Sequence, residues 1–590
     1  MNVNQYIISE LNKKVSEKRE LSLEFLSRLK RKASRKFGLP CPTNIELLKT
    51  FREMVKNNII LSPSKNVMVR QAHHNILKQI ESILITKNIR TSSGVAVIAV
   101  LTKPYPCPGT CVFCPNEKNM PKSYLSNEPA VMRAILTDFH PYKQTSARLK
   151  SLKATGHDID KIELIVMGGT FSYLPKNYQT WFIKECFRAC NEFNNKKNLK
   201  ILSLESHQKI NVKSKCRIVG LTLETRPDYI NEKEIINMRK LGATRVELGV
   251  QSIYDDVLKL NKRGHGRVEI IQATKLLKEA GFKINYHMMP NLPGSNYKKD
   301  LAMFKELFSN PDFQPDMLKI YPCVVVKNAP IYKWYKDDKY KPYSDKKLIE
   351  LLSEIKKIIP HYVRITRLIR DIPSTSIVAG NKVSNLRQVL KKKSEEENWQ
   401  CKCIRCREIR NQNPHFLKKG QEMVKDLKLF RQDYDASNGK EIFLSFEDKK
   451  RMHIYSLLRL RVNKSVVARS EATWQSQNLT QSTSHPEIPP IPAYPKGKPF
   501  IKGETIIPVL QDATIIREVH TYGKLTPIKS NNKKHTQHTG LGKKLIHEAE
   551  RITEKEFGLK KIAVISGVGV RDYYRKLGYR LEDGYMVRKI

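Results

Sequence analysis

Six short apolar runs, separated by segments with helical periodicity, constrain most strongly how this chain can fold. They lie between residues 90 and 370 and read GVAVIAVLT, IELIVMGG, CRIVGLTLET, RVELGVQS, KINYHMMPN and MLKIYPCVV. Strands separated by helices form parallel βαβ units, because each helix returns the chain to the same edge of the sheet. Six such units predict an α/β fold with a full or partial β/α barrel.

The length of the chain predicts further domains around this barrel. Its 590 residues exceed what one hydrophobic core usually organises. We expect a basic helical region over 1–80, the barrel over 81–370, a connector over 371–420 and a last domain over 421–590. The last domain starts with strand-like segments and holds a polar, proline-rich insertion at 464–503, which lacks the apolar content to pack.

The charge balance indicates a polyanionic partner. The chain has 107 Lys and Arg residues against 58 Asp and Glu residues, a formal net charge of +49, and such a field attracts polyanions. Nucleic acid is the expected partner, and a solvated lysine-rich surface is the alternative. Six basic residues crowd into 28–38, where they either contact phosphates or form a solvated helix face: Arg28, Lys30, Arg31, Lys32, Arg35 and Lys36.

Neither export nor a membrane partner is expected. The apolar run VAVIAVL at 95–101 is far shorter than the roughly 20 residues that span a bilayer. The N-terminus, MNVNQYIISELNKK, lacks the pattern of a secretory signal. The chain has 11 cysteines, many of them in two tight clusters, which suits a reducing compartment where thiols bind metal. We therefore expect a cytoplasmic protein.

Three cysteines follow the first apolar run with the spacing C-x3-C-x2-C: Cys107, Cys111 and Cys114. The loop that leaves a barrel strand is where barrel enzymes place their chemistry. Four thiolates would close a zinc site or ligate an iron–sulfur cube fully, whereas three leave one metal position without a protein ligand. A structural zinc with a distant fourth ligand is the alternative.

This motif resembles that of the radical S-adenosylmethionine (SAM) superfamily. The resemblance implies a [4Fe–4S] cluster whose open iron is chelated by SAM, and cleavage of SAM to a 5'-deoxyadenosyl radical. Gly168, Gly169 and Thr170 resemble the glycine-rich motif that binds the amino group of SAM, and Glu224 and Gln251 at later strand ends are expected to contact SAM as well. Ordinary buried polar networks are the alternative for each of these residues.

A second cysteine cluster, Cys401, Cys403 and Cys406, has the spacing C-x-C-x2-C and no barrel strand before it. A structural zinc ion that stabilises the connector explains this cluster most simply. Free thiols in a basic loop are the alternative. The spacing assigns no fourth ligand, for which the candidates are His361, His415 and His453.

Glycines open a helix near the C-terminus in QHTGLGKKLIHEAER. Exposed N–H groups and the positive end of the helix dipole form a pyrophosphate cradle there. With KKIAVISG and RDYYRKLGY behind it, the segment resembles the GNAT acetyltransferase fold, which implies that Tyr574, in preference to Tyr573, contacts the thioester or protonates the leaving thiolate. A packing role is the alternative. The expected acetyl-CoA contacts are Gln537, His538, Thr539, Gly540, Leu541, Gly542 and Tyr574.

The combination resembles the family of the Elongator catalytic subunit, and the compact cysteine spacing favours its stand-alone prokaryotic type. EPAVMRAILTDFHPY, NKRGHG, HMMPNLPG, CKCIRCREI and REVHTYG carry the resemblance, which covers most of 30–590. It implies a radical SAM partial barrel joined through a zinc-binding connector to an α+β GNAT domain.

The implied activity is carboxymethylation of the wobble uridine (U34) of tRNA at C5. The deoxyadenosyl radical would take a hydrogen atom from the acetyl methyl group of acetyl-CoA, the carbon radical would add to C5, and thioester hydrolysis would leave 5-carboxymethyluridine. The implied partners are the anticodon loop of tRNA, acetyl-CoA and an electron donor for the cluster.

Recognition of an anticodon loop requires stacking and base contacts beyond phosphate attraction. The residues expected to provide them are Arg364, Arg367 and Arg370 in RITRLIRD and Lys319 and Tyr321 in LKIYP; a basic surface stripe is the alternative. Two other functions remain open. One is a protein lysine acetyltransferase with a purely structural cluster, and the other is a non-catalytic tRNA-binding subunit.

Overall fold

The computed structural model describes most of the chain, with gaps at seven main places along it. Gln537, His538, Thr539, His415 and the insertion 464–503 lie outside the described residues. Among the helices that the structure does describe, none is long and apolar enough to cross a bilayer. The described residues are 1–17, 20–57, 59, 67–85, 91, 93–193, 195, 199–409, 426–463, 505–523 and 540–590.

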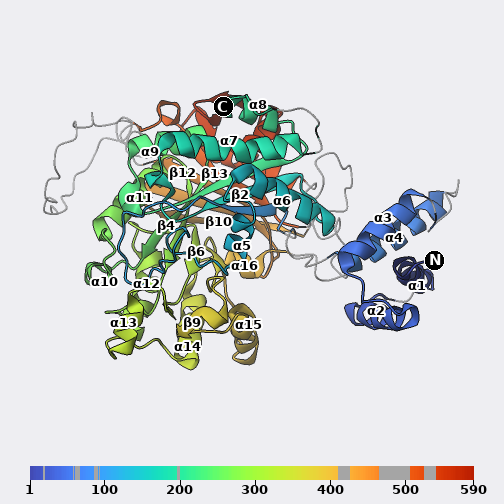
Figure 1. Cartoon of the computed structure of the whole chain (residues 1–590). Coiled ribbons are helices and arrows are strands. Elements are labelled where there is room, and N and C mark those ends of the chain that lie inside the picture. Colours follow the sequence, from blue (N-terminus) through green and yellow to red (C-terminus); the bar gives the residue numbers. More distant parts are fainter. Residues whose placement is uncertain are drawn as a thin grey trace, which may run out of the picture.

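Four N-terminal helices form a unit at one side of the body (Figure 1). Asn2 and Thr43 each close a capping box that starts a helix, and Gly38, with φ +63°, ends another. The helices pack around their own cluster of buried apolar side chains, which includes Ile8 and Phe51. Their bounds are α1 (Val3–Ser16), α2 (Leu23–Phe37), α3 (Asn44–Lys56) and α4 (Val67–Leu84).

Seven parallel strands build the first sheet, in the order β1-β2-β3-β4-β5-β6-β8. Neighbours in this sheet are almost always successive strands. Among the described residues β1 does not pair with β8, so the sheet is an open partial barrel. This confirms the predicted fold class. The strands are β1 (Ala96–Leu101), β2 (Lys161–Met167), β3 (Arg217–Thr225), β4 (Arg245–Gln251), β5 (Lys283–Met288), β6 (Met317–Ile320) and β8 (Arg364–Arg367).

The barrel strands alternate between a helix-covered face and a face that borders a cavity. On β2, Ile162 and Leu164 are fully buried, whereas Glu163 and Ile165 line the cavity. Helices surround the sheet, and several of them pack against its outer face (Figure 1). They are α5 (Pro129–Ile135), α6 (Pro141–Ala154), α7 (Lys176–Glu192), α8 (Leu204–Asn211), α9 (Glu232–Leu241), α10 (Asp255–Leu260), α11 (Arg267–Glu279), α12 (Tyr297–Ser309), α13 (Ile331–Lys336), α14 (Asp345–Ile358) and α15 (Leu386–Glu396).

A second sheet of seven strands, in the order β10-β11-β12-β13-β14-β16-β15, forms the C-terminal domain. All its neighbouring pairs are antiparallel except β13 and β14. The helix α20 (Leu541–Lys555) packs on one face of this sheet. The other elements are β10 (Lys428–Asp435), β11 (Gly439–Glu447), β12 (Ile454–Asn463), β13 (Thr514–Thr521), β14 (Lys561–Val564), α21 (Arg571–Arg575), β15 (Arg580–Glu582) and β16 (Tyr585–Lys589).

Buried ion pairs join the second face of this sheet to the partial barrel. Arg517 on β13 is fully buried and bonds Asp316, which precedes β6, and Glu441 on β11. Arg459 on β12 lies 3.5 Å from the same Asp316 carboxylate, and Lys278 of α11 lies 3.9 Å from Glu441. The two domains therefore share one continuous interior.

Backbone packing brings the domains together at a second place. Gly567 follows β14, and a side chain there would overlap the main-chain oxygen of Val219 on β3. A side chain on Gly569 would begin 2.9 Å from the main-chain oxygen of Ile218, which is also too close. Only glycine permits this approach of two backbones.

Candidate active site

The three-cysteine loop lies between β1 and α5, at the carboxyl end of β1. Main-chain hydrogen bonds fix it to distant segments: Val112 N donates to Asn261 O at 3.2 Å, and Ile331 N donates to Val112 O at 2.8 Å. The side chain of Cys111 is buried, and those of Cys107 and Cys114 are partly exposed. All three cysteines border the cavity.

Two arginines surround the thiols. Nη1 of Arg263 lies 3.3 Å from Sγ of Cys111. A hydrogen bond from Cys114 and the guanidinium of Arg263 lower the pKa of Cys111 to about 5. Arg226 donates two hydrogen bonds to the carboxylate of Asp228, through Nε and Nη2. Its Nη1 is buried without a hydrogen-bond partner. Because thiolates ligate iron and the free N–H group can meet an anion, these residues fit a cluster with an anionic ligand.

Further polar groups border the same cavity at the ends of β2, β3 and β4. Gly169, with φ +95°, and Thr170 line the cavity. Gly168 serves packing instead, because a side chain there would overlap the hydroxyl of Thr102. Gln251 has φ +70°, and its buried Oε1 has no partner; such strained residues collect at functional sites.

A charged group occupies the middle of the cavity wall. Glu224, Glu247 and His287 place their ligand atoms within 4.8 Å of one another. The ammonium of Lys319 bonds Glu247 and lies 3.7 Å from Glu224, so it fills the role that a cation would have there. Burial opposes the charge, but the carboxylate of Glu247 still raises the pKa of Lys319. Tyr321 lies next to this group and also borders the cavity.

The three arginines of RITRLIRD border the cavity in different ways. Arg364 bonds Glu408 at 2.7 Å and donates to the Tyr522 hydroxyl at 3.1 Å. Arg370 donates to the hydroxyl of Ser123 at 3.0 Å. Arg367 pairs with Asp371 and keeps 46% of its side chain exposed. Arg364 and Arg370 therefore have internal partners, and Arg367 is the most accessible of the three.

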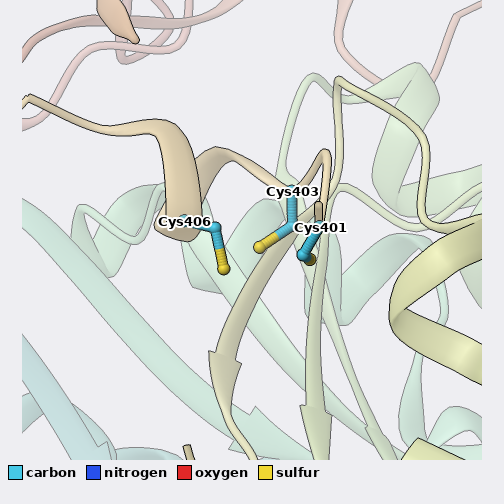
Figure 2. Close-up of side chains that lie close together, drawn as sticks. All are labelled: Cys401, Cys403 and Cys406. Carbon is cyan, nitrogen blue, oxygen red and sulfur yellow. The ribbon is translucent and has the colours of Figure 1, made fainter. Parts of the chain in front are cut away.

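The second cysteine cluster lies outside this cavity. Cys401, Cys403 and Cys406 place their sulfur atoms within 4.8 Å of one another, around the start of α16 (Ile404–Arg407) (Figure 2). This distance suits a single metal ion. In the part of the chain that the structure describes, neither His361 nor His453 belongs to this group.

The C-terminal domain opens a passage beside α20. β13 pairs with β14 only from Thr514 to Ile516 and then continues to Thr521 with β12 as its one strand neighbour among the described residues. Gly540, with φ +81°, precedes the first turn of α20, and Gly542 and Lys543 in that turn border the cavity. The free N–H groups of a helix start can bind phosphate.

The two tyrosines of α21 differ in their surroundings. Tyr574 is 6% exposed and packs against Tyr579 in the domain core. Tyr573 is 43% exposed, and its hydroxyl lies 3.7 Å from where a side chain on Gly542 would begin. Both tyrosines border the cavity.

One cavity of about 1200 Å³ connects all of these groups except the second cysteine cluster. It is lined by Cys107, Cys111 and Cys114 from the barrel and by Gly542 and Tyr573 from the C-terminal domain. The thiol loop and the helix start thus open into the same space.

Known proteins match nearly the whole chain. Residues 105–307 match the Radical SAM superfamily, and 315–396 match the Radical_SAM C-terminal domain. The tRNA uridine(34) acetyltransferase of Methanocaldococcus infernus is 43% identical over 99% of this chain and 98% of its own length. Elongator complex protein 3 of Saccharomyces cerevisiae is 37% identical over 92% of this chain and 93% of its own. The chain belongs to the Elongator complex protein 3 family.

A solved structure of this family agrees with the fold. The archaeal Methanocaldococcus infernus Elp3 with N-terminus deletion is 43% identical, with a TM-score of 0.67 over 85% of this chain and 100% of that chain. The predicted resemblance is confirmed. The radical SAM matches support a [4Fe–4S] cluster and SAM as cofactors of this Elongator complex protein 3 family member.

Sequence reasoning missed residues that reach the site from distant segments. Arg263 contacts Cys111 from the turn before α11, and His520 on β13 borders the cavity from the other domain. Both lie in stretches that resemble the family, NKRGHG and REVHTYG, but no local spacing marks either residue as functional.

Proposed function

We propose that this protein carboxymethylates the wobble uridine of tRNA at C5, with acetyl-CoA and SAM as co-substrates. The shared cavity carries this proposal, because radical chemistry on an acyl donor needs both groups in one chamber. The relatives' name, tRNA uridine(34) acetyltransferase, supports tRNA as the substrate and acyl transfer as the reaction class.

On the radical side, Cys107, Cys111 and Cys114 would hold the cluster. With SAM bound, the cluster supplies a radical that can take a hydrogen atom from the acetyl methyl group. The free Nη1 of Arg226 can meet the SAM carboxylate, and Oε1 of Gln251 can accept a hydrogen bond from a donor on SAM. Gly169, Thr170 and Glu224 are proposed contacts beside them. An external electron donor would reduce the cluster.

On the acyl side, α20 would hold the pyrophosphate of acetyl-CoA at its first turn. Gly540, Leu541 and Gly542 present main-chain groups there, and Gln537, His538 and Thr539 are proposed contacts that precede the described helix. Tyr574 stays the predicted acid for the leaving thiolate. The accessible hydroxyl of Tyr573 makes it a second candidate for this role.

tRNA would contact two regions. On α2, the side chains of Arg28, Arg31, Lys32, Arg35 and Lys36 are exposed, as phosphate contact requires, and Lys30 is partly so. Lys319 is only 8% exposed, so the uridine base would leave its stack and enter the cavity to approach it. Tyr321, Arg364, Arg367 and Arg370 are proposed contacts on the way.

The four-part division of the chain is part of this proposal. The separate cluster of α1–α4 supports an N-terminal tRNA-binding unit over 1–80. The first sheet supports a radical SAM unit over 81–370, and the second sheet supports a GNAT unit over 421–590.

The reduced protein, incubated without oxygen with tRNA, SAM and acetyl-CoA, is expected to give 5'-deoxyadenosine and 5-carboxymethyluridine. Mass spectrometry of the small molecules and of digested tRNA measures both. Omission of acetyl-CoA is the control and should remove the modified uridine. Acetyl-lysine without 5'-deoxyadenosine, from protein with an intact cluster, would show a lysine acetyltransferase instead. Unchanged tRNA modification in cells that carry Cys107→Ala would show a non-catalytic tRNA-binding subunit.

Zinc at Cys401, Cys403 and Cys406 is a separate proposal about stability. The three close thiols support it, and the neighbouring Arg407 bonds Glu447 at 2.7 Å, which ties this segment to β11. Cys403→Ser is expected to remove one zinc atom per chain and to lower the melting temperature, because a structural metal contributes to folding. Elemental analysis and calorimetry measure the two effects. Cys41→Ser, at an exposed thiol, is the control; unchanged zinc in Cys403→Ser would contradict the proposal.

A further inference from the structure

The proposed reaction ends with hydrolysis of a thioester, and the strand β13 presents one histidine to the space where that step would occur. Past Ile516, β13 has only β12 as a neighbour, so its other edge borders the passage beside β14. Val519 and Thr521 face α20, since both lie within 4 Å of a side chain built on Gly542. His520 faces the opposite way, toward the partial barrel.

This geometry places His520 where a thioester would emerge. A phosphate group bound at the start of α20 would lie on one face of the second sheet, and the cysteine loop lies beyond the other face. A cofactor that joins the two must pass through the opening between β13 and β14. Its thioester would then lie beside His520, which borders the cavity and is partly exposed.

The imidazole of His520 is held in one tautomer. Nε2 lies 2.8 Å from the main-chain oxygen of Ser93. Because a carbonyl oxygen only accepts, Nε2 carries the hydrogen atom, and Nδ1 carries a lone pair. The ring also packs against Tyr522, with 4.3 Å between the ring centroids and an angle of 30° between the planes, which limits its rotation.

Burial favours the neutral form of this imidazole. Burial lowers the pKa of His520, Glu518 and the hydrogen bond to Ser93 oppose this shift, and Arg364 of β8 and Lys283 of β5 add to it. A neutral imidazole with a fixed lone pair has the form that a general base requires.

Glu518, the nearest carboxylate on the same strand, is a poorer base. It bonds Nε of Arg459 at 2.9 Å and lies 3.3 Å from Nζ of Lys283. Although burial opposes the shift, the cations Lys283 and Arg459 lower the pKa of Glu518 to about 2. A carboxylate held in this way has little affinity for a proton near neutral pH.

We propose that His520 is the general base for the hydrolysis of the CoA thioester, a proposal that rests on the proposed function for its substrate. Nδ1 takes a proton from a water molecule while the water oxygen bonds to the thioester carbonyl carbon. The carbon–sulfur bond then breaks, and the imidazolium returns the proton to the departing thiolate. One water is consumed, and one carboxylic acid and one free thiol are formed.

His520→Gln is expected to release free CoA thiol about 100-fold more slowly, because general bases typically contribute 10²–10⁴-fold. The first turnover should still yield 5'-deoxyadenosine, and the modified tRNA should keep CoA as a thioester that hydroxylamine cleaves. Imidazole added to His520→Ala should restore thiol release, whereas a purely structural role would not respond. His547→Gln, at an exposed histidine on α20, is the matched control.

Two further measurements separate the possible failures. Binding of a thioether analogue of acetyl-CoA and the melting temperature should match the unsubstituted protein, which excludes misfolding. Free 5-carboxymethyluridine formed by His520→Gln at the unsubstituted rate would overturn the role of His520. Absence of 5'-deoxyadenosine from the unsubstituted protein would overturn the proposed function instead. In that case the rate of thiol release from acetyl-CoA alone, measured for the unsubstituted protein and for His520→Gln, would still test the role of His520.

Discussion

Cys107→Ala is expected to remove the cluster iron and to slow 5'-deoxyadenosine formation by about 10³-fold or more, a barrier increase of about 4 kcal/mol. The loop offers three thiols to the proposed cluster, and two thiolates would not hold an iron–sulfur cube in place. Binding of acetyl-CoA should persist, because α20 belongs to the other domain. An iron count, the absorbance spectrum without oxygen and mass spectrometry measure these effects.

Cys41→Ala is the matched control for this substitution, because Cys41 is an exposed thiol that precedes α3. It should keep both the iron and the production of 5'-deoxyadenosine. Full iron content and normal SAM cleavage in Cys107→Ala would contradict the assignment of this loop to the cluster.

Arg517→Met is expected to lower the free energy of unfolding by about 3–5 kcal/mol, the range for breaking one partner of a buried ion pair. The substitution leaves the carboxylates of Asp316 and Glu441 buried with fewer partners, and both of them are fully enclosed. Denaturant titration measures the loss. Arg551→Met, which breaks an exposed pair with Glu548, should have little effect.

The loss caused by Arg517→Met should shrink in acid. Although burial opposes it, Arg517 lowers the pKa of Asp316 in the folded protein, so this pair stabilises the fold at pH values above the ordinary carboxyl range of about 4. As pH falls through the folded pKa, the stabilisation disappears. In Arg517→Met the buried carboxyl group of Asp316 takes up a proton at a higher pH than in the unsubstituted protein. Protonation removes the free-energy cost of burying an unpaired charge. A destabilisation that stays constant from pH 7 to pH 3 would contradict this explanation.

Local patterns allowed much of the fold to be predicted, and they failed where the pattern is short. The six apolar runs became six parallel strands. The seventh strand, β8, has four residues, Arg364–Arg367, and begins and ends with arginine, so that no apolar run marks it. The arginines of this segment were predicted to contact tRNA, with a basic surface stripe as the alternative, and no strand was expected; Ile365 is nevertheless fully buried in the sheet.

The candidate site divides in the same way. The thiols lie within eight residues of one another, so their spacing reveals them. The groups that contact these thiols come from distant parts of the sequence. Arg263, which lies next to the Cys111 thiol, is 152 residues after it in the chain. His520 approaches Ser93 across 427 residues and from another domain. Such contacts depend on the packing of the two sheets, which no local spacing encodes.

The glycine contacts between the domains determine how wide the reaction chamber can be. At Gly567 and Gly569 the main chain of one domain lies against the main chain of β3, with no side chain between them. Changes of side chains elsewhere on this interface can reshape the walls of the chamber, but they cannot bring its two halves closer together. The minimum separation between the cysteine loop and the start of α20 is therefore a property of the backbone.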